Sequence, residues 1–192
     1  MKKTSIVLSA FFVLTAFTIA GTVWKSDKPH SQLTFTITHM GIADVSGTFN
    51  DFDVTINSSK PDFSDAVFEL KAKTNSINTR VEMRDNHLKS ADFFEVEKYP
   101  EIHFKSNAIT ATTKNNYKLS GDLTMHGITK PVTMDLEYRG TVEDAAKNKK
   151  TAGFRLTGVL KRSDFNIGPK FPEPALSDEV RIKADGEFAP QQ

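Results

Sequence analysis

Apolar and polar residues alternate along most of the chain beyond residue 30. In the first such stretch, Leu33, Phe35 and Ile37 alternate with threonines. The same period of two recurs over residues 52–56, 66–73, 102–105, 117–126, 132–139, 154–161 and 180–188. Successive side chains of a β-strand point to opposite faces, so each stretch predicts a strand with one apolar and one polar face.

Turn-forming residues separate these stretches and predict hairpin connections. They include Pro61, the pair Asn115–Asn116, Gly127 and the proline-bearing segment 169–174. About eight antiparallel strands are expected, and closure into a barrel removes the exposed edges of such a sheet. The polar face carries charges such as Lys71 and Lys161, so we expect the apolar face to point inward. An eight-stranded barrel is either filled by side chains or holds one small ligand.

One segment breaks the alternation and predicts a helix. Thr79 and Glu82 have the spacing of a capping box, in which each side chain binds a free backbone N–H group of the other. The spacing predicts a short helix from Arg80 to about Lys89. Its apolar residues are too few for a core helix, so we expect it on the surface, across one end of the barrel.

Residues 1–20 have the pattern of a secretory signal peptide. Two lysines precede an uncharged apolar run that ends in small residues at Thr18 and Ala20. We expect cleavage after Ala20, export to the periplasm, and one domain over residues 21–192 without a membrane span. Cleavage lowers Lys+Arg from 25 to 23 against 24 Asp+Glu, a balance that does not favour nucleic acid as a partner. The chain has no cysteine, which excludes disulfides and a thiol-linked lipid anchor.

No catalytic or metal-binding motif stands out. The five histidines lack the close spacings of zinc sites, and there is no nucleophile elbow or phosphate-binding loop. We therefore expect no metal and no cofactor. Asp27, His30 and Ser31 lie close together and resemble a nucleophilic set, but catalytic triads are assembled in space, so we expect local bonding within a turn instead. The segment from Arg84 to His87 is either a solvated helix face or an acid/base group on the predicted helix.

Phenylalanine is the most informative residue type, because twelve of the fifteen lie beyond residue 20. These rings either fill the barrel or line a cavity for a long apolar ligand, and periodicity alone does not separate the two. Phe93 and Phe94 directly follow the predicted helix. They can cover the mouth of a cavity, pin the helix to the barrel, or do both.

A series of motifs spans nearly the whole chain beyond residue 20. In order, they are Trp24, Asp27, His30–Ser31, His39–Met40–Gly41, Gly47, Arg84–Asp85–Asn86–His87, Asp92–Phe93–Phe94, Tyr99–Pro100, His126–Gly127, Lys130–Pro131 and Arg162–Ser163–Asp164–Phe165. Together they resemble the YceI-like family of exported, polyisoprenoid-binding proteins. The chain departs from the family pattern at Ser26, where an apolar residue is usual, and at Asn166, where glycine is frequent.

The resemblance implies a lipocalin-like barrel whose interior tunnel binds an amphiphile with a long isoprenoid or similar chain. The residues expected to bind this lipid are Phe35, Ile37, Phe49, Phe68, Leu70, Phe93, Phe94, Phe104, Leu123, Leu136, Phe154 and Phe165. The candidate head-group contacts are His39, Arg84, Asp85 and His87.

We therefore expect a periplasmic lipid-binding or carrier protein that is not an enzyme. Two alternatives stay open. One is a hydrolase or isomerase acting on such an amphiphile, with the head-group candidates as acid/base groups. The other is a purely structural stress-response protein with a filled barrel.

Overall fold

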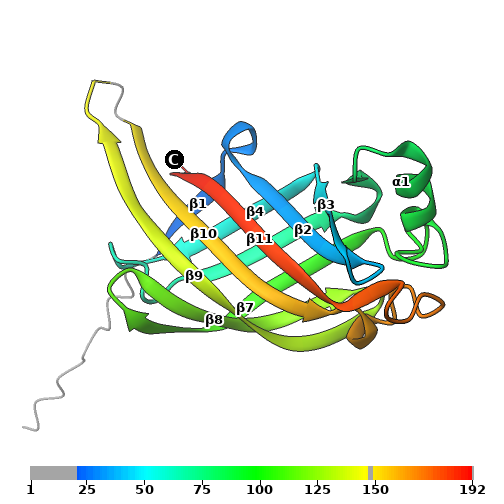
Figure 1. Cartoon of the computed structure of the whole chain (residues 1–192). Coiled ribbons are helices and arrows are strands. Elements are labelled where there is room, and N and C mark those ends of the chain that lie inside the picture. Colours follow the sequence, from blue (N-terminus) through cyan, green and yellow to red (C-terminus); the bar gives the residue numbers. More distant parts are fainter. Residues whose placement is uncertain (1–20, 147–148, 192) are drawn as a thin grey trace, which may run out of the picture.

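The computed structural model describes residues 21–146 and 149–191, so the predicted signal peptide lies outside the described residues. The described residues form eleven strands and one α-helix (Figure 1). The strands are β1 (Thr22–Ser26), β2 (Gln32–His39), β3 (Ala43–Phe49), β4 (Phe52–Ser58), β5 (Val67–Lys73), β6 (Ile77–Asn78), β7 (Glu101–Thr113), β8 (Asn116–Met125), β9 (Ile128–Asp144), β10 (Lys149–Lys161) and β11 (Leu176–Pro190). The helix is α1 (Glu82–Lys89), and short 3-10 helices occupy Lys28–His30, Thr74–Ser76 and Arg162–Phe165.

Eight of these strands close into an antiparallel barrel. Hydrogen-bonded neighbours follow the order β1-β4-β5-β7-β8-β9-β10-β11, and β11 returns to β1 where Ser26 lies opposite Phe188. Closer to its start, β11 pairs with β2 instead, and β3 and β6 extend that wall. The structure confirms the predicted mainly β, antiparallel barrel with one short helix.

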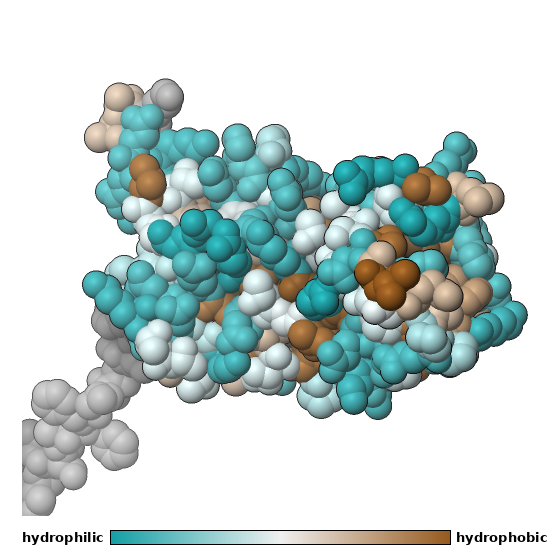
Figure 2. All heavy atoms as spheres, in the orientation of Figure 1, coloured by the Kyte–Doolittle hydropathy of each residue, from teal (hydrophilic) through white to brown (hydrophobic). Residues whose placement is uncertain are grey.

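Strand alternation separates the inside of the barrel from the outside, as predicted. On β8, Leu119 and Leu123 are buried, whereas Lys118 and Asp122, each directly before one of them, are exposed. Polar residues cover most of the outer face seen in Figure 2. The apolar face of the strands therefore forms the barrel interior.

Helix α1 is present, but its start differs from the prediction. Val81 occupies the N-cap without a side-chain cap, and Arg80 before it has a left-handed φ of 66°. This turn takes Thr79 out of capping position. Thr79 instead donates its backbone N–H to the Asp85 carboxylate at 2.7 Å, and its hydroxyl oxygen accepts a hydrogen bond from Arg84 Nε at 2.7 Å. The predicted capping box is therefore wrong.

One end of the barrel is filled by an aromatic plug, which consists of Trp24, Phe63, Tyr138, Phe154 and Phe188. The ring of Phe63 is central, with centroid distances of 5.2 Å to Trp24, 5.1 Å to Tyr138 and 4.9 Å to Phe154. Phe63 does not come from a strand. It enters from the β4–β5 loop, which lies at the opposite end of the barrel from α1 (Figure 1), and only 2% of it is exposed.

Hydrogen bonds hold the β4–β5 loop in place around Asp65. The Asp65 carboxylate accepts hydrogen bonds from the hydroxyls of Ser58 and Ser59 and, at 3.0 Å, from the Ser59 backbone N–H. Burial raises the pKa of this carboxyl, but the hydrogen bonds from Ser58 and Ser59 outweigh burial and hold the pKa well below its usual range. Tyr117 donates its hydroxyl to the Asp62 carbonyl at 2.7 Å. These contacts fix the loop that carries Phe63.

Candidate binding cavity

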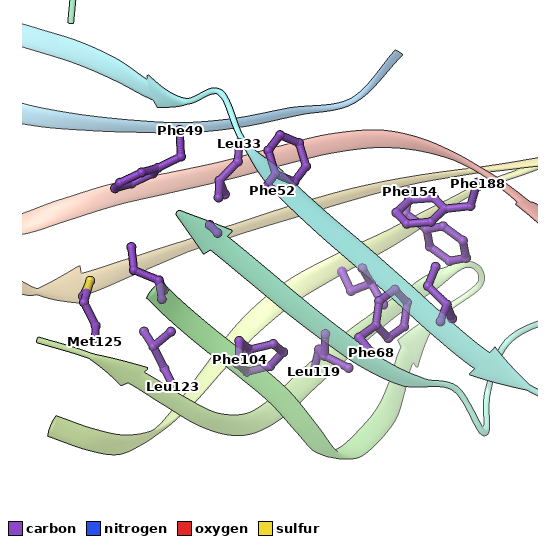
Figure 3. Packing of buried hydrophobic residues seen from close by; sticks show 14 of the residues in the cluster. Leu33, Phe49, Phe52, Phe68, Phe104, Leu119, Leu123, Met125, Phe154 and Phe188 are labelled. Atoms are coloured by element: carbon purple, nitrogen blue, oxygen red, sulfur yellow. The ribbon is translucent and has the colours of Figure 1, made fainter. Parts of the chain in front are cut away.

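The other half of the barrel is hollow. It contains a cavity of about 460 Å³ lined mainly by apolar side chains. Along one wall, the inward residues of β2 and β11 pair directly: Ile37 with Val180, Phe35 with Ile182, and Leu33 with Ala184. Figure 3 shows Leu33 and Phe49 on one side of the interior, with Phe104 and Leu123 on the other. This hollow interior contradicts the filled-barrel alternative.

Eleven of the twelve predicted lipid-binding residues line this cavity. They are Phe35, Ile37, Phe49, Phe68, Leu70, Phe93, Phe94, Phe104, Leu123, Leu136 and Phe154. Phe165 is the exception, because it is packed in the 3-10 helix Arg162–Phe165, outside the cavity wall, and only 1% of it is exposed. Phe68, Phe154 and Phe188 form the floor of the cavity, where it meets the aromatic plug. The cavity is therefore closed at this end rather than an open tunnel.

The cavity opens at the end that carries α1. His39 and His87 both line the cavity and are exposed, so the cavity reaches the surface between them. Arg84 also lines the cavity here, and its Nη2 donates to the Thr79 carbonyl at 2.9 Å. Asp85, the fourth head-group candidate, does not line the cavity. Its carboxylate instead accepts the Thr79 hydrogen bonds described above.

A group of side chains closes over part of this mouth, and we call it the clasp: His87, Asp92, Phe93, Lys170 and Phe171. The rings of Phe93 and Phe171 are stacked with centroids 5.0 Å apart, and His87 packs edge-on against both. Lys170 Nζ lies 2.7 Å from the Asp92 carboxylate, and His87 Nε2 lies 3.3 Å from it. Hydrogen bonds from Lys170 and His87 lower the pKa of Asp92. The clasp joins the segment after α1 to the loop before β11.

Phe93 and Phe94 therefore have different contacts. Phe93 is buried in the clasp, whereas Phe94 is half-buried and packs edge-on against Phe49 at 5.7 Å. Both rings line the cavity. Phe93 fixes the segment after α1 to the barrel, as a pin would, and both rings form part of the mouth.

Sequence reasoning missed the role of Arg162, which is buried beside the mouth. Its guanidinium donates hydrogen bonds to five backbone carbonyls, those of Ile167, Gly168, Phe171, Leu176 and Ser177. A guanidinium has five N–H donors, so this network uses its full capacity. Arg162 thereby holds the loop that supplies Phe171. The motif Arg162–Phe165 is visible in the sequence, but an arginine beside Lys161, Ser163 and Asp164 has the pattern of a surface charge.

Asn166 and the Asp27–His30 turn behave as simple local chemistry. Asn166 adopts a left-handed conformation with φ of 53°, which asparagine tolerates better than most residues, so the bend is kept without glycine. His30 Nδ1 lies 3.1 Å from the Asp27 carboxylate, as expected for local bonding. Within the described ranges, Asp27, His30 and Glu187 are also the side chains placed closely enough to share a metal ion. None of them lines the cavity.

The chain belongs to the YceI-like family, since the YceI-like domain matches residues 24–188. A UPF0312 protein of Pseudomonas putida strain GB-1 is 36% identical over 189 residues, which cover 95% of this chain and 97% of the relative. A UPF0312 protein of Staphylococcus aureus strain N315 is 34% identical and covers 85% of this chain and 95% of the relative.

Solved structures share the fold. The YceI protein of Campylobacter jejuni is 28% identical, with a TM-score of 0.74 over 96% of this chain and 100% of its own. A polyisoprenoid-binding domain from Saccharophagus degradans has a TM-score of 0.67 at 14% identity, over 88% of this chain and 98% of its own, which shows likeness of fold alone. No helix among the described residues is long and apolar enough to cross a membrane.

Proposed function

We propose that this protein is an exported, periplasmic lipid carrier that holds a polyisoprenoid or similar long-chain amphiphile in the barrel cavity. The observation that carries the proposal is the apolar cavity itself, closed by aromatic rings at its floor and open at a polar mouth. Apolar cavities of this kind are poorly hydrated and bind apolar molecules. Burying a hydrocarbon chain contributes about 25 cal/mol per Å² of apolar surface, so a long chain binds without many polar contacts.

The head group of the amphiphile lies at the mouth in this proposal. Arg84 donates hydrogen bonds to Thr79 from its Nε and its Nη2, while its Nη1 has no hydrogen-bond partner among the described residues. His39 and His87 stand at the same opening. These three side chains favour a head group that accepts hydrogen bonds or carries negative charge. Asp85 is engaged by Thr79 and takes no part.

Export rests on the signal-like residues 1–20 and is part of the proposal. A binding role, rather than catalysis, is supported by the family membership and by the polyisoprenoid-binding domain that shares the fold. The candidate acid/base set is also incomplete at the mouth, because Asp85 faces Thr79 instead of the cavity.

The test uses two tryptophan variants on strand β10. Leu156 lines the cavity, whereas Val159 on the opposite face is 54% exposed. Leu156→Trp should fill part of the cavity and weaken binding of a fluorescent polyene fatty acid at least tenfold. Val159→Trp, the matched control, should bind as the unchanged protein does. Mass spectrometry of organic extracts should find a long-chain lipid with the unchanged protein and the control. Equal binding by both variants, with no extracted lipid, contradicts the proposal.

A further inference from the structure

Two serines, Ser26 and Ser31, lie beside the aromatic floor of the cavity, a placement that its apolar walls do not lead one to expect. On β2, the inward positions run from His39 at the mouth to Leu33, and the next inward position is Ser31. These eight residue steps correspond to about 26 Å of extended strand. Ser31 therefore lies at the inner end of the cavity, as far from the mouth as a long extended chain reaches.

The hydroxyl of Ser31 is buried without a partner. Its Oγ is inaccessible to solvent and makes no hydrogen bond within residues 21–146 and 149–191. Gly186 on β11 faces it, and a Cβ at that position would lie 2.9 Å from Ser31 Oγ and 3.1 Å from the Phe188 ring. Only glycine therefore fits beside the hydroxyl, because a Cβ would clash with it. Buried polar atoms are nearly always satisfied, so a ligand group at the floor of the cavity is expected to supply the missing partner.

A second hydroxyl reaches the same floor. Ser26 lines the cavity from β1, opposite Phe188. Its Oγ accepts a hydrogen bond from the Val54 backbone N–H at 3.1 Å. A serine hydroxyl has one hydrogen to donate besides its acceptor lone pairs, so Ser26 keeps its donor. Two hydroxyl donors are therefore available at the inner end of an otherwise apolar cavity.

The charged side chains around the floor are paired or exposed. Asp185 also borders the cavity, but its carboxylate is paired with Arg155 and Lys183, each at 2.8 Å. Glu187 is exposed beside His30. No cation among the described cavity-lining residues stands at the floor, since Arg84 lies at the mouth and Arg162 beside it. An ionised group would be costly to bury here, whereas a neutral oxygen would not.

We propose that Ser26 and Ser31 form a second polar subsite, which binds a neutral oxygen, a hydroxyl or a carbonyl, at the inner end of the bound chain. The ligand class is then a long-chain amphiphile with polar groups at both ends: a head group at the mouth and an uncharged oxygen about 26 Å away. This inference rests on the proposed lipid-binding function and specifies the ligand of the same cavity.

The experiment compares fatty acids with their ω-hydroxy derivatives over a series of chain lengths. The probes compete with a fluorescent polyene fatty acid on the full exported protein. At the length that reaches Ser31, the ω-hydroxy acid should bind roughly three- to tenfold more tightly than the parent acid, the gain of about one neutral hydrogen bond. Shorter and longer pairs should show a smaller gain. The double variant Ser26→Ala with Ser31→Ala should remove the gain while the parent acids still bind.

The control is Ser120→Ala, because Ser120 faces outward on β8 and bonds to Thr133. It should keep the length-dependent gain. Ligand-free Ser31→Ala should melt no lower than the unchanged protein, since its hydroxyl has no partner to lose. Equal affinities of both acids at every length overturn the polar subsite but leave the carrier function standing. A lowered melting temperature of Ser31→Ala also overturns it, by assigning Ser31 a structural role. Failure of every chain to bind overturns the carrier function itself.

Discussion

The two halves of this barrel share their strands and their alternation, yet one is solid and the other hollow. Strand β10 contributes Phe154 to the aromatic plug and Leu156 and Leu160 to the cavity wall. What differs is the loop at each end. The β4–β5 loop sends Phe63 into the interior, whereas α1 and the clasp lie across the opposite mouth. The comparison indicates that loop residues, rather than the strand pattern, decide which half is filled.

This division also separates two roles. In the aromatic plug, each ring contacts others on several sides, and such close packing stabilises the folded state. In the hollow half, wall side chains have contacts on one side and a cavity on the other. Changes in the plug should therefore act on stability first, and changes in the wall should act on ligand binding first.

The largest expected effect is the removal of the central ring. Phe63→Ala should lower the free energy of unfolding by about 3–5 kcal/mol, because a fully buried phenylalanine is lost. Phe35→Ala, in the half-buried cavity wall, should cost less than half as much. Urea denaturation of ligand-free protein measures both. Equal losses would mean that the hollow half is as tightly packed as the plug.

The next effect comes from adding volume instead of removing it. Ala152 is fully buried opposite Phe188 in the plug, and Ala184 lines the cavity. Ala152→Leu should destabilise the fold by about 1–3 kcal/mol through overpacking. Ala184→Leu should leave the melting temperature of ligand-free protein nearly unchanged, because the added methyls enter empty space, and should weaken lipid binding. The reverse ranking of the two melting temperatures would contradict the assignment of the two halves.

A smaller effect is expected at the loop that carries Phe63, and it depends on pH. The folded-state pKa of Asp65 lies below its unfolded-state pKa of about 3.9. The contribution of Asp65 to the free energy of unfolding is therefore complete above the unfolded-state pKa, and it is lost as the pH falls toward the folded-state pKa. Asp65→Asn should cost about 1 kcal/mol at pH 7, a value reduced by its partial exposure. The unfolding midpoints of Asp65→Asn and of the unchanged protein should converge between pH 5 and pH 2. A constant difference between the two midpoints across this range would mean that the stability of the loop does not depend on ionisation of Asp65.

The smallest stability change is expected at the mouth. Phe94→Ala should lower the unfolding free energy by less than about 1 kcal/mol, since this half-buried ring already borders the cavity. It should nevertheless speed the dissociation of a fluorescent long-chain amphiphile severalfold, as stopped-flow measurements would show. Phe93→Ala should cost more stability, because Phe93 is buried against Phe171. If Phe94→Ala unfolds the protein without a separate change in dissociation, the ring is a pin and not a cover.

Much of this architecture follows from the sequence, because alternation assigns each strand residue to a face. Positions such as Phe35, Phe104 and Leu136 could be placed on the inner face of the barrel without knowing any contact. The presence of a cavity could not be predicted in this way, because the same pattern suits a filled barrel. Phe63 fills one half of the barrel, and it lies in a polar loop, where the alternation of strand residues predicts nothing. Its isolation as an aromatic residue among serine, proline and aspartate is the signal that could have found it.

The remaining misses involve polar residues whose partners, or lack of a partner, depend on local backbone conformation. The capping box at Thr79 and Glu82 was wrong because Arg80 adopts a left-handed conformation that spacing alone does not reveal. Arg162 belongs to a motif visible in the sequence, but the sequence does not reveal that five backbone carbonyls surround its guanidinium. Ser31 resembled an ordinary turn residue, and its buried hydroxyl becomes evident only when Gly186 is placed opposite it.

Because of the clasp, opening of the cavity mouth and opening of the barrel occur on different timescales. Opening the clasp would separate the Phe93–Phe171 ring stack and the Lys170–Asp92 ion pair, whose lysine side chain is 72% exposed, and would break no strand pairing. Loop motions of this kind take nanoseconds to microseconds, and lid opening takes microseconds to seconds. The closed ring of strands opens only at a rate set by global unfolding. A ligand can therefore enter and leave many times within the lifetime of a single folded barrel.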